Sequence, residues 1–315
     1  MNNYIPPYKI TSKILKLSTQ ISEELTKLQF TDAQKVNPML RKKNRIKILA
    51  GTLEIEGNFL GEEKITAILD GKKVLGTVKE LSEVQGAIKA YEKLDAFVFD
   101  ELDDLLLAHK ILMDEILTTA GTFRSVNVKV AEHIAPQPSM INDLMIKLFS
   151  WLKNSDEHML LKSCIFHYEF EFIHPFSDGN GRIGRLWQSV ILNRFNPIFS
   201  FLPTESIVRN HQEEYYKAIE DSTVVGESTP FIEFMLEMIL ESIKNTLKSN
   251  QKNNYKSDQK VLALMKENSR ITIYELMEKL SMSESGIKKV IKKLKDENII
   301  SRVGSLKSGH WEIKE

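Results

Sequence analysis

A stretch of twelve residues, HPFSDGNGRIGR from His174 to Arg185, combines residue types that handle phosphate chemistry. It follows one predicted helix and leads into the next. Its glycines, Gly179, Gly181 and Gly184, allow unusual backbone angles and the close approach of a ligand. Backbone amides at the start of the following helix point outward and carry partial positive charge, so this turn is expected to bind an anion.

The charged side chains of the same stretch complete the chemistry. Arg182 and Arg185 lie on one face of the first helical turn, and guanidinium groups suit phosphate oxygens. Asp178, the only carboxylate in the loop, is placed to hold Mg²⁺ against the phosphates. His174 can remove a proton from an incoming hydroxyl near neutral pH. A lone loop histidine or an Asp-Gly turn is usually structural, but the full set predicts phosphoryl-type transfer.

The stretch fits the Fic family motif, HxFx(D/E)GNGRxxR, at every defined position, and the chain resembles that family over roughly residues 30–240. The resemblance implies a magnesium-dependent enzyme that transfers AMP from ATP to a Ser, Thr or Tyr hydroxyl of a protein and releases pyrophosphate. It implies that His174 is the general base, that Asp178 is the Mg²⁺ ligand and that Phe176 anchors the loop.

The same resemblance assigns the nucleotide contacts. Asn180, with Gly179 and Gly181, is expected to form an anion hole, and its side chain is expected to hold phosphate oxygens as well. Arg182 is expected to contact the α- and β-phosphates, and Arg185 the γ-phosphate.

A second motif, TLEIEGN from Thr52 to Asn58, ends an early predicted helix. The helix dipole disfavours a carboxylate at Glu56 by about 0.3–1 kcal/mol, and on this ground alone a solvated glutamate is the ordinary interpretation. The segment resembles the Fic inhibitory pattern (S/T)xxxE(G/N), with Thr52 first and Glu56 fifth. The resemblance implies that Glu56 pairs with Arg185 and keeps the enzyme autoinhibited, with the phosphates of ATP misplaced for in-line attack.

Alternating apolar residues in Val126–His133 predict a strand in a small hairpin. The segment resembles the family's flap, which pairs with a strand of the target protein. By similarity, Val130 and His133 are expected to lie against the nucleotide. Tyr215 and Tyr216 are expected to stack on adenine or border it, although an aromatic pair on a helix is usually part of the core.

Helices are predicted for nearly all of the elements that must position these residues. Apolar residues recur at helical spacing in Arg41–Glu56, Asp100–Thr119, Ile141–Lys153, His158–Phe172, Ile183–Arg194, Gln212–Asp221 and Phe231–Leu247. Towards the C-terminus, we expect helices at Gln259–Glu267, Ile273–Leu280 and Ser283–Glu297, and strands at Ser301–Val303 and His310–Ile313. Three helices and a two-stranded wing describe a winged helix-turn-helix.

The predicted fold class is therefore mainly α: a Fic/Fido helical domain with a β-hairpin flap, followed by a winged helix-turn-helix domain. We expect an N-terminal helical region at 1–95, with the inhibitory helix at about 41–58, and a catalytic domain at 96–244. A polar linker is expected at 245–257 and the winged helix at 258–315.

Composition excludes several classes of protein. Lys and Arg number 43, as do Asp and Glu, so no global field points to nucleic acid. A single cysteine, Cys164, excludes an intramolecular disulfide and a cysteine-based zinc cluster. No segment approaches the ~20 apolar residues that span a bilayer, so we expect a cytoplasmic protein without membrane association.

Alternatives stay open at this point. The loop is expected to contact phosphates rather than the base, so transfer of UMP or phosphate competes with AMP transfer. The resemblance adds removal of AMP as an alternative, because in some relatives the glutamate at the position of Glu56 supports it. A DNA-binding regulator that only senses nucleotide is another candidate, although such a sensor would not need His174. Lysines on the third C-terminal helix suit nucleic acid, but Glu284, Asp296 and Glu297 dilute them, and a lysine-rich face is often merely solvated. Protein docking or target recruitment is therefore preferred to DNA binding as the role of this helix, whose lysines are Lys288, Lys289, Lys292, Lys293 and Lys295. The resemblance also leaves homodimer formation and self-modification open.

Overall fold

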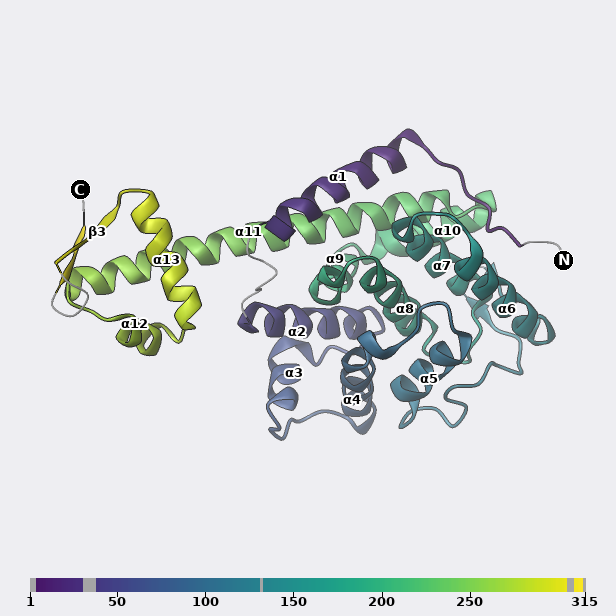
Figure 1. Ribbon diagram of the computed structural model, residues 1–315. Coiled ribbons are helices and arrows are strands. Elements are labelled where there is room, and N and C mark those ends of the chain that lie inside the picture. The colour runs from purple at the N-terminus through teal and green to yellow at the C-terminus, as the bar shows by residue number, and fades with distance from the viewer. Residues whose placement is uncertain (1–3, 31–37, 131–132, 305–308, 314–315) are drawn as a thin grey trace. The chain divides into compact units, whose positions relative to one another are not determined.

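The computed structural model describes residues 4–30, 38–130, 133–304 and 309–313 (Figure 1). The chain divides into two compact units, Met1–Lys244 and Asn245–Glu315. Each unit has its own fold, and the first contains the twelve-residue motif.

Helices make up almost all of the first unit. Its elements in chain order are α1 (Ser12–Phe30), α2 (Pro38–Ile55), α3 (Gly61–Leu69), α4 (Val78–Glu92), the 3₁₀ helix η2 (Leu94–Ala96), α5 (Leu102–Met113), β1 (Lys129–Val130), β2 (His133–Ile134), α6 (Pro138–Asn154), α7 (Met159–Ile173), α8 (Asn180–Phe195), the 3₁₀ helix η3 (Pro197–Phe201), α9 (Thr204–Asn210), α10 (Gln212–Val225) and α11 (Thr229–Glu267), which also contains the boundary between the units.

The centre of the first unit is α7, which packs along α8. Its residues are buried almost all round, as expected for a helix that other elements surround on every side. Among the largest fully buried side chains are Phe166 and Phe170 of α7 and Trp187 of α8. The turn between these two helices, which carries the motif, is therefore held between the most deeply buried elements of the unit.

Helix α2 lies against α9 and α8 in the same unit. At Gly51 the backbones of α2 and α9 approach so closely that a Cβ atom would lie 2.5 Å from the backbone nitrogen of Ser206. Gly57 then ends the helical path with a φ of 86°, which L side chains rarely adopt. This close packing fixes the position of Glu56, between the last helical turn and Gly57.

The hairpin has shorter strands than the alternating valines predict. Lys129 pairs with Ile134 and Val130 with His133 in an antiparallel register, and residues 131–132 lie outside the described part. The predicted strand starts at Val126, but the carbonyl of that residue accepts a hydrogen bond from Arg124 instead of from the opposite strand.

The second unit is a winged helix-turn-helix, as predicted. The end of α11 is followed by α12 (Ile273–Leu280), α13 (Glu284–Asp296) and the antiparallel strands β3 (Ile300–Val303) and β4 (His310–Ile313). One small core unites them, with its buried side chains supplied by Val261, Met265, Ile271, Leu276, Ile287, Val290, Ile291, Leu294, Ile300 and Trp311.

The structure departs from the prediction at the boundary between the units. Residues 245–257, expected to be a linker between two helices, are helical and belong to α11. The segment NTLKSNQKNNYKS contains neither Gly nor Pro, and Lys and Gln have good helix propensity, so nothing in it stops a helix. The unit boundary falls at its start, whereas the finer division at residue 95 stays a prediction.

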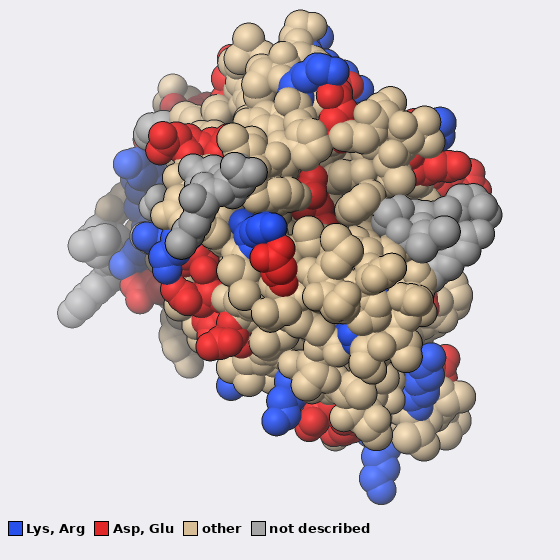
Figure 2. Space-filling view, turned by 90° about the vertical axis from the view of Figure 1, so that its right-hand side faces the viewer, with Lys and Arg blue, Asp and Glu red and all other residues tan. Residues whose placement is uncertain are grey.

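The surface carries both signs of charge. On the face that Figure 2 draws, acidic and basic side chains are interspersed among uncharged ones. Within the described parts of the chain, no helix has the length and apolar character that crossing a membrane requires.

Candidate active site

Two left-handed residues shape the turn between α7 and α8. His174 caps α7 with φ 49° and ψ 60°, and its N–H still donates to the carbonyl of Phe170 at 2.9 Å. Gly179 precedes α8 with a φ of 83°. The first amides of α8 have no partner within the helix, so they face the loop as donors at the positive end of the dipole. This arrangement is suited to binding an anion.

Asn180 locks the loop from inside. Its side-chain oxygen accepts the N–H of Phe176 at 2.9 Å, and its side-chain amide donates to the carbonyl of the same residue at 2.8 Å. Each of these atoms can make a second hydrogen bond, so the contact of this side chain with phosphate oxygens stays a prediction. Asn180 can still offer its backbone N–H.

His109 on α5 supports the loop from outside and was not predicted. Its ring stacks on Phe176 with centroids 3.6 Å apart, and its Nδ1 accepts the N–H of Gly121 at 2.8 Å. Nε2 therefore carries the proton and donates to the carbonyl of Asp178 at 3.0 Å. Burial lowers the pKa of His109 to about 4, so the ring is neutral at pH 7.

Arg124 joins the hairpin to the same loop. This buried side chain donates from Nε to the carbonyl of His174 at 2.8 Å. It also donates to the carbonyls of Val126 at 2.8 Å and Pro136 at 2.6 Å, which flank the two strands. One guanidinium thus fixes the base of the hairpin relative to His174. Nothing in its sequence context, between Phe123 and Ser125, marks it.

Arg182 lies between two carboxylates. Its guanidinium is buried and lies 3.1 Å from Glu83 Oε1 and 3.1 Å from Asp178 Oδ1. Glu83, on α4, also accepts the side-chain amide of Asn58 at 2.8 Å. A chain of polar contacts therefore runs from the residue after Gly57 to the loop, through a glutamate that the sequence did not single out.

The Asp178 carboxylate meets the requirements of a magnesium ligand. Its side chain is 47% exposed, in contrast with the buried Arg182 beside it. Mg²⁺ keeps several waters and is usually bound by one or two carboxylates together with substrate phosphates. A single accessible carboxylate next to an anion-binding helix terminus fits that donor set.

Arg185 is the most enclosed cation of the site. Its Nη2 lies 2.8 Å from Glu56 Oε1, its Nε donates to Thr52 Oγ1 at 3.0 Å, and Nη2 also donates to the Thr52 carbonyl at 3.1 Å. Burial opposes the charge, but Glu56, Tyr215 and Glu171 together outweigh it, so the pKa of Arg185 lies above its usual value. The two residues predicted to pair are thus in contact.

Two of the motif glycines leave space for side chains of neighbouring elements. A Cβ atom at Gly181 would lie 2.5 Å from Glu56 Oε1, so a side chain there would push that carboxylate out of its present position. At Gly184 a Cβ atom would lie 2.7 Å from Glu171 Oε1 and 3.0 Å from the ring of His167. Gly184 therefore faces α7, which corrects its predicted role in phosphate binding.

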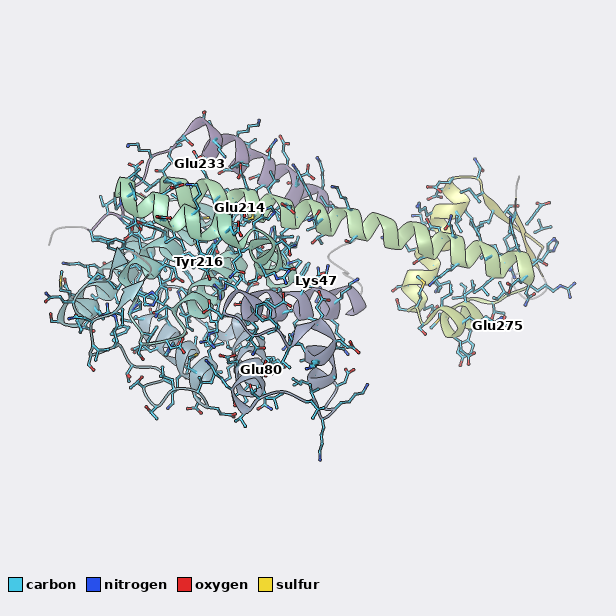
Figure 3. The ribbon with its side chains drawn as sticks, turned by 180° about the vertical axis from the view of Figure 1, so that it is seen from behind. Lys47, Glu80, Glu214, Tyr216, Glu233 and Glu275 are labelled. Atoms are coloured by element: carbon cyan, nitrogen blue, oxygen red, sulfur yellow. The ribbon has the colours of Figure 1, made fainter. Side chains whose placement is uncertain are left out.

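The predicted base pocket also needs correction. Tyr215 is 1% exposed, and its hydroxyl lies 3.1 Å from Nε2 of His167, so it belongs to the core. Neighbouring helix residues point about 100° apart, so the two tyrosines cannot share one environment. Tyr216 is 49% exposed on α10 (Figure 3), and its hydroxyl donates to the carbonyl of Ile55 at 3.4 Å. Only Tyr216 is available to border a ligand.

The hairpin contacts stay predictions. The backbones of Val130 and His133 pair across the two strands. Their side chains lie outside the described part of the structure, as do residues 131–132.

Known proteins resemble this chain in sequence and in structure. Residues 99–192 match the family described as Fic/DOC family, and residues 256–301 match Winged helix-turn-helix DNA-binding. A crystal structure of a Fic family protein from Desulfovibrio desulfuricans G20 shares 33% identity with a TM-score of 0.76, covering 99% of this chain and 98% of that one. The structure of Fic-1 (residues 134–508) from Caenorhabditis elegans has a TM-score of 0.62 at 21% identity, covering 76% and 72%, which shows a shared fold.

Curated relatives match over part of their length. Protein adenylyltransferase Fic of Culex quinquefasciatus is 30% identical over 195 residues, which are 58% of this chain and 38% of that protein. Protein adenylyltransferase fic-1 of Caenorhabditis elegans is 28% identical over 242 residues, 72% of this chain and 45% of that protein. The chain therefore spans less than half the length of these relatives.

His109→Phe tests whether the buried ring supports the loop. The variant keeps the stack on Phe176 but removes partners from the Asp178 carbonyl and the Gly121 N–H, so at pH 7 the free energy of unfolding should fall by about 2–4 kcal/mol. The folded pKa of about 4 lies below the ordinary 6.5, so the wild type loses stability as pH falls from 6.5 towards 4. At pH 5 the difference between the two proteins should be about 2 kcal/mol smaller. Urea unfolding at both pH values measures this, and an unchanged difference would contradict a neutral His109.

Proposed function

The chain belongs to the Fic family, and from this premise we propose that it is a protein adenylyltransferase, which transfers AMP from ATP to a Ser, Thr or Tyr hydroxyl of a protein. The observation that carries the proposal is one turn that joins His174, Asp178 and two arginines to the anion-binding start of α8. The names of the curated relatives, protein adenylyltransferase, support the same activity.

The proposed reaction assigns each group of the turn one task. The phosphates of ATP lie at the start of α8, where Arg182 and Arg185 neutralise their charge. Asp178 holds Mg²⁺, which when bound withdraws charge from the phosphate oxygens. Nε2 of His174 accepts the proton of the target hydroxyl as its oxygen attacks the α-phosphorus. The bond between that phosphorus and the bridging oxygen of the β-phosphate breaks, and pyrophosphate leaves.

The acceptor is proposed to be a protein segment held by the hairpin. Strands β1 and β2 are two residues long each, and Arg124 ties their base to His174. An extended peptide can add to such an edge through backbone hydrogen bonds, which register a hydroxyl while reading little side-chain sequence.

Glu56 is proposed to restrain this activity. Nη2 and Nε of Arg185 donate to Glu56 and Thr52, so a γ-phosphate reaches Nη2 only by displacing the carboxylate. The charge on Glu56 also repels the phosphate that would take its place. ATP that enters beside Glu56 is then held with its α-phosphorus out of line for attack.

A labelling experiment with α-³²P-ATP tests both parts of the proposal. Glu56→Gly should take up at least ~10-fold more label into protein than the wild type, because Arg185 becomes available to the phosphates, whereas Glu56→Gly with His174→Ala should take up none. Glu54→Gly is the matched control, since Glu54 lies on the last turn of α2 but pairs with Arg209 at 2.6 Å. Equal labelling of both glycine variants would contradict a specific role for Glu56. A folded Glu56→Gly protein without label, also in cell lysate, would refute AMP transfer.

DNA binding by the second unit is a second candidate function, and the uneven distribution of charge between the two units favours it. Residues 245–315 contain 15 Lys and Arg against 9 Asp and Glu, whereas residues 1–244 contain 28 against 34. The net charges of +6 and −6 cancel in the whole chain, which hides a basic unit.

The lysines of α13 lie on its exposed side. Ile287, Val290, Ile291 and Leu294 face the core, which leaves the lysines on the opposite side. Two of them are ion-paired there, Lys288 with Glu284 and Lys293 with Asp258, each at 2.6 Å. In helix-turn-helix domains the corresponding helix enters the major groove, where lysines contact phosphates.

Charge reversal on α13 tests this candidate in the full chain. Lys288→Glu with Lys292→Glu should weaken binding to duplex DNA at least ~10-fold at low salt, in a fluorescence anisotropy titration. Lys16→Glu with Lys43→Glu, at exposed positions of the first unit, is the matched control and should bind like the wild type. Absence of binding at 50 mM salt, or an equal loss in both double variants, would contradict the candidate.

A further inference from the structure

The proposed reaction leaves one buried carboxylate of the site without a role. Glu171, on the last turn of α7, is 9% exposed, and its Oε1 has no hydrogen-bond partner among the described residues. That oxygen lies under Gly184, where a Cβ atom would come within 2.7 Å of it. A buried carboxyl oxygen without a hydrogen-bond partner is costly, so its place in the site calls for an explanation.

Two imidazoles lie next to Glu171, and only one of them has a nitrogen that can bind the Glu171 carboxylate. Nε2 of His167 is 3.8 Å from Oε1, but both nitrogens of that ring are engaged, by Gln188 at 2.8 Å and Tyr215 at 3.1 Å. Burial lowers the pKa of His167 to about 3, so this ring stays neutral. Nδ1 of His174, the ring that must accept a proton in the proposed reaction, is 3.9 Å from Oε2.

We propose that Glu171 is a positioning residue for His174. Its carboxylate accepts the Nδ1–H of the imidazole, which leaves the Nε2 lone pair free to take the proton of the target hydroxyl. The same carboxylate stabilises the imidazolium that forms. The inference rests on the proposed function, in which His174 is the general base.

The distance between the two groups fits a pair that closes during the reaction. At 3.9 Å the contact is too long for a hydrogen bond, and a movement of about 1 Å would make one. Hydrogen bonds between catalytic groups are often long before substrate binds and tighten in the complex. Because His174 caps α7 and Glu171 lies one turn back, a side-chain rotation suffices.

The charged groups around Glu171 set its protonation. Burial raises its pKa to about 8, Arg185 on α8 opposes this, and Glu56 after α2 adds to it. The hydroxyl of Tyr215, on α10, faces the same space. Removing the Glu56 carboxylate therefore favours the ionised form of Glu171, which is the form that supports the base.

Glu171→Gln in the Glu56→Gly background tests the inference by kinetics. The amide keeps the shape and can still accept Nδ1–H, but it cannot stabilise an imidazolium. We expect kcat to fall about 10-fold with KM for ATP unchanged, and the acid limb of the pH profile between pH 5.5 and 9 to move to lower pH. Glu169→Gln is the matched control, since Glu169 is also buried on α7 but accepts the hydroxyl of Tyr4 at 2.5 Å. It should keep the parent's kcat and profile.

A second readout does not need activity. In ¹⁵N-histidine NMR titrations, the resonances absent from His174→Ala identify that ring, and Glu171→Gln should lower the pKa of His174 while Glu169→Gln leaves it in place. If Glu171→Gln does not fold, Glu171→Met, which keeps the length of the side chain and removes its charge, replaces it in the same two measurements, with the same expected directions.

The outcomes separate the inference from the proposed function. An unchanged pH profile and an unchanged pKa of His174 in Glu171→Gln would overturn the positioning role. A rise in KM for ATP at constant kcat would also overturn it, because it would show that Glu171 acts on ATP binding through Arg185. A Glu56→Gly protein that transfers no AMP would refute the proposed function, while the NMR titration would still decide whether Glu171 and His174 interact.

Discussion

The site depends on the charge of one buried guanidinium. Arg185 is 3% exposed, and a cation in that position is stable only with an anion or several acceptors against it. In this chain Glu56 and Thr52 supply them from the end of α2. Several features elsewhere follow from this contact. Gly51 lets α2 approach α9, Gly57 turns the chain after Glu56, and Gly181 leaves space for the carboxylate. An anionic ligand at the same position would replace Glu56 as the partner.

A second set of buried polar contacts prepares the loop before any ligand is present. Asn180 holds the backbone of Phe176, His109 holds the carbonyl of Asp178, and Arg124 holds the carbonyl of His174. Each contact comes from a different element, so the amides at the start of α8 and the backbone of His174 keep fixed positions. Donors that are already oriented need no reorganisation when charge develops on a phosphate, which is the main source of electrostatic catalysis.

The sequence predicted what is local and missed what is tertiary. The motif from His174 to Arg185 is contiguous, so its residue types and spacing carried the prediction. His109 and Arg124 reach the loop from α5 and from the start of the hairpin, and single charged or polar residues in those segments give no periodic signal. Burial decided the roles that needed correction, because a glycine or a tyrosine looks the same in sequence whether it faces a ligand or a helix.

The contrast between local features, which were predicted, and other features, which were not, also applies to the fold. Helices with a continuous apolar face, such as α6, were predicted within a few residues, and so were α12 and α13. Helix α4 was missed although it begins with a capping box between Thr77 and Glu80, because its few buried side chains are mostly small. The polar part of α11 lacks apolar periodicity, so the sequence predicts a linker there. It is helical because a helix that has already begun extends at low cost through residues that include neither Gly nor Pro.

The most direct test of the account asks whether Glu56 and ATP compete for Arg185. Dissociation constants for ATP and AMP can be measured by calorimetry on His174→Ala and on the same protein with Glu56→Gly, since neither variant should turn ATP over. The account predicts that loss of Glu56 raises the affinity for ATP about 10-fold, or about 1.4 kcal/mol. The affinity for AMP should stay unchanged, because only ATP has a phosphate that reaches Arg185. Equal affinities for ATP in the two proteins, or an equal gain for AMP, would contradict it.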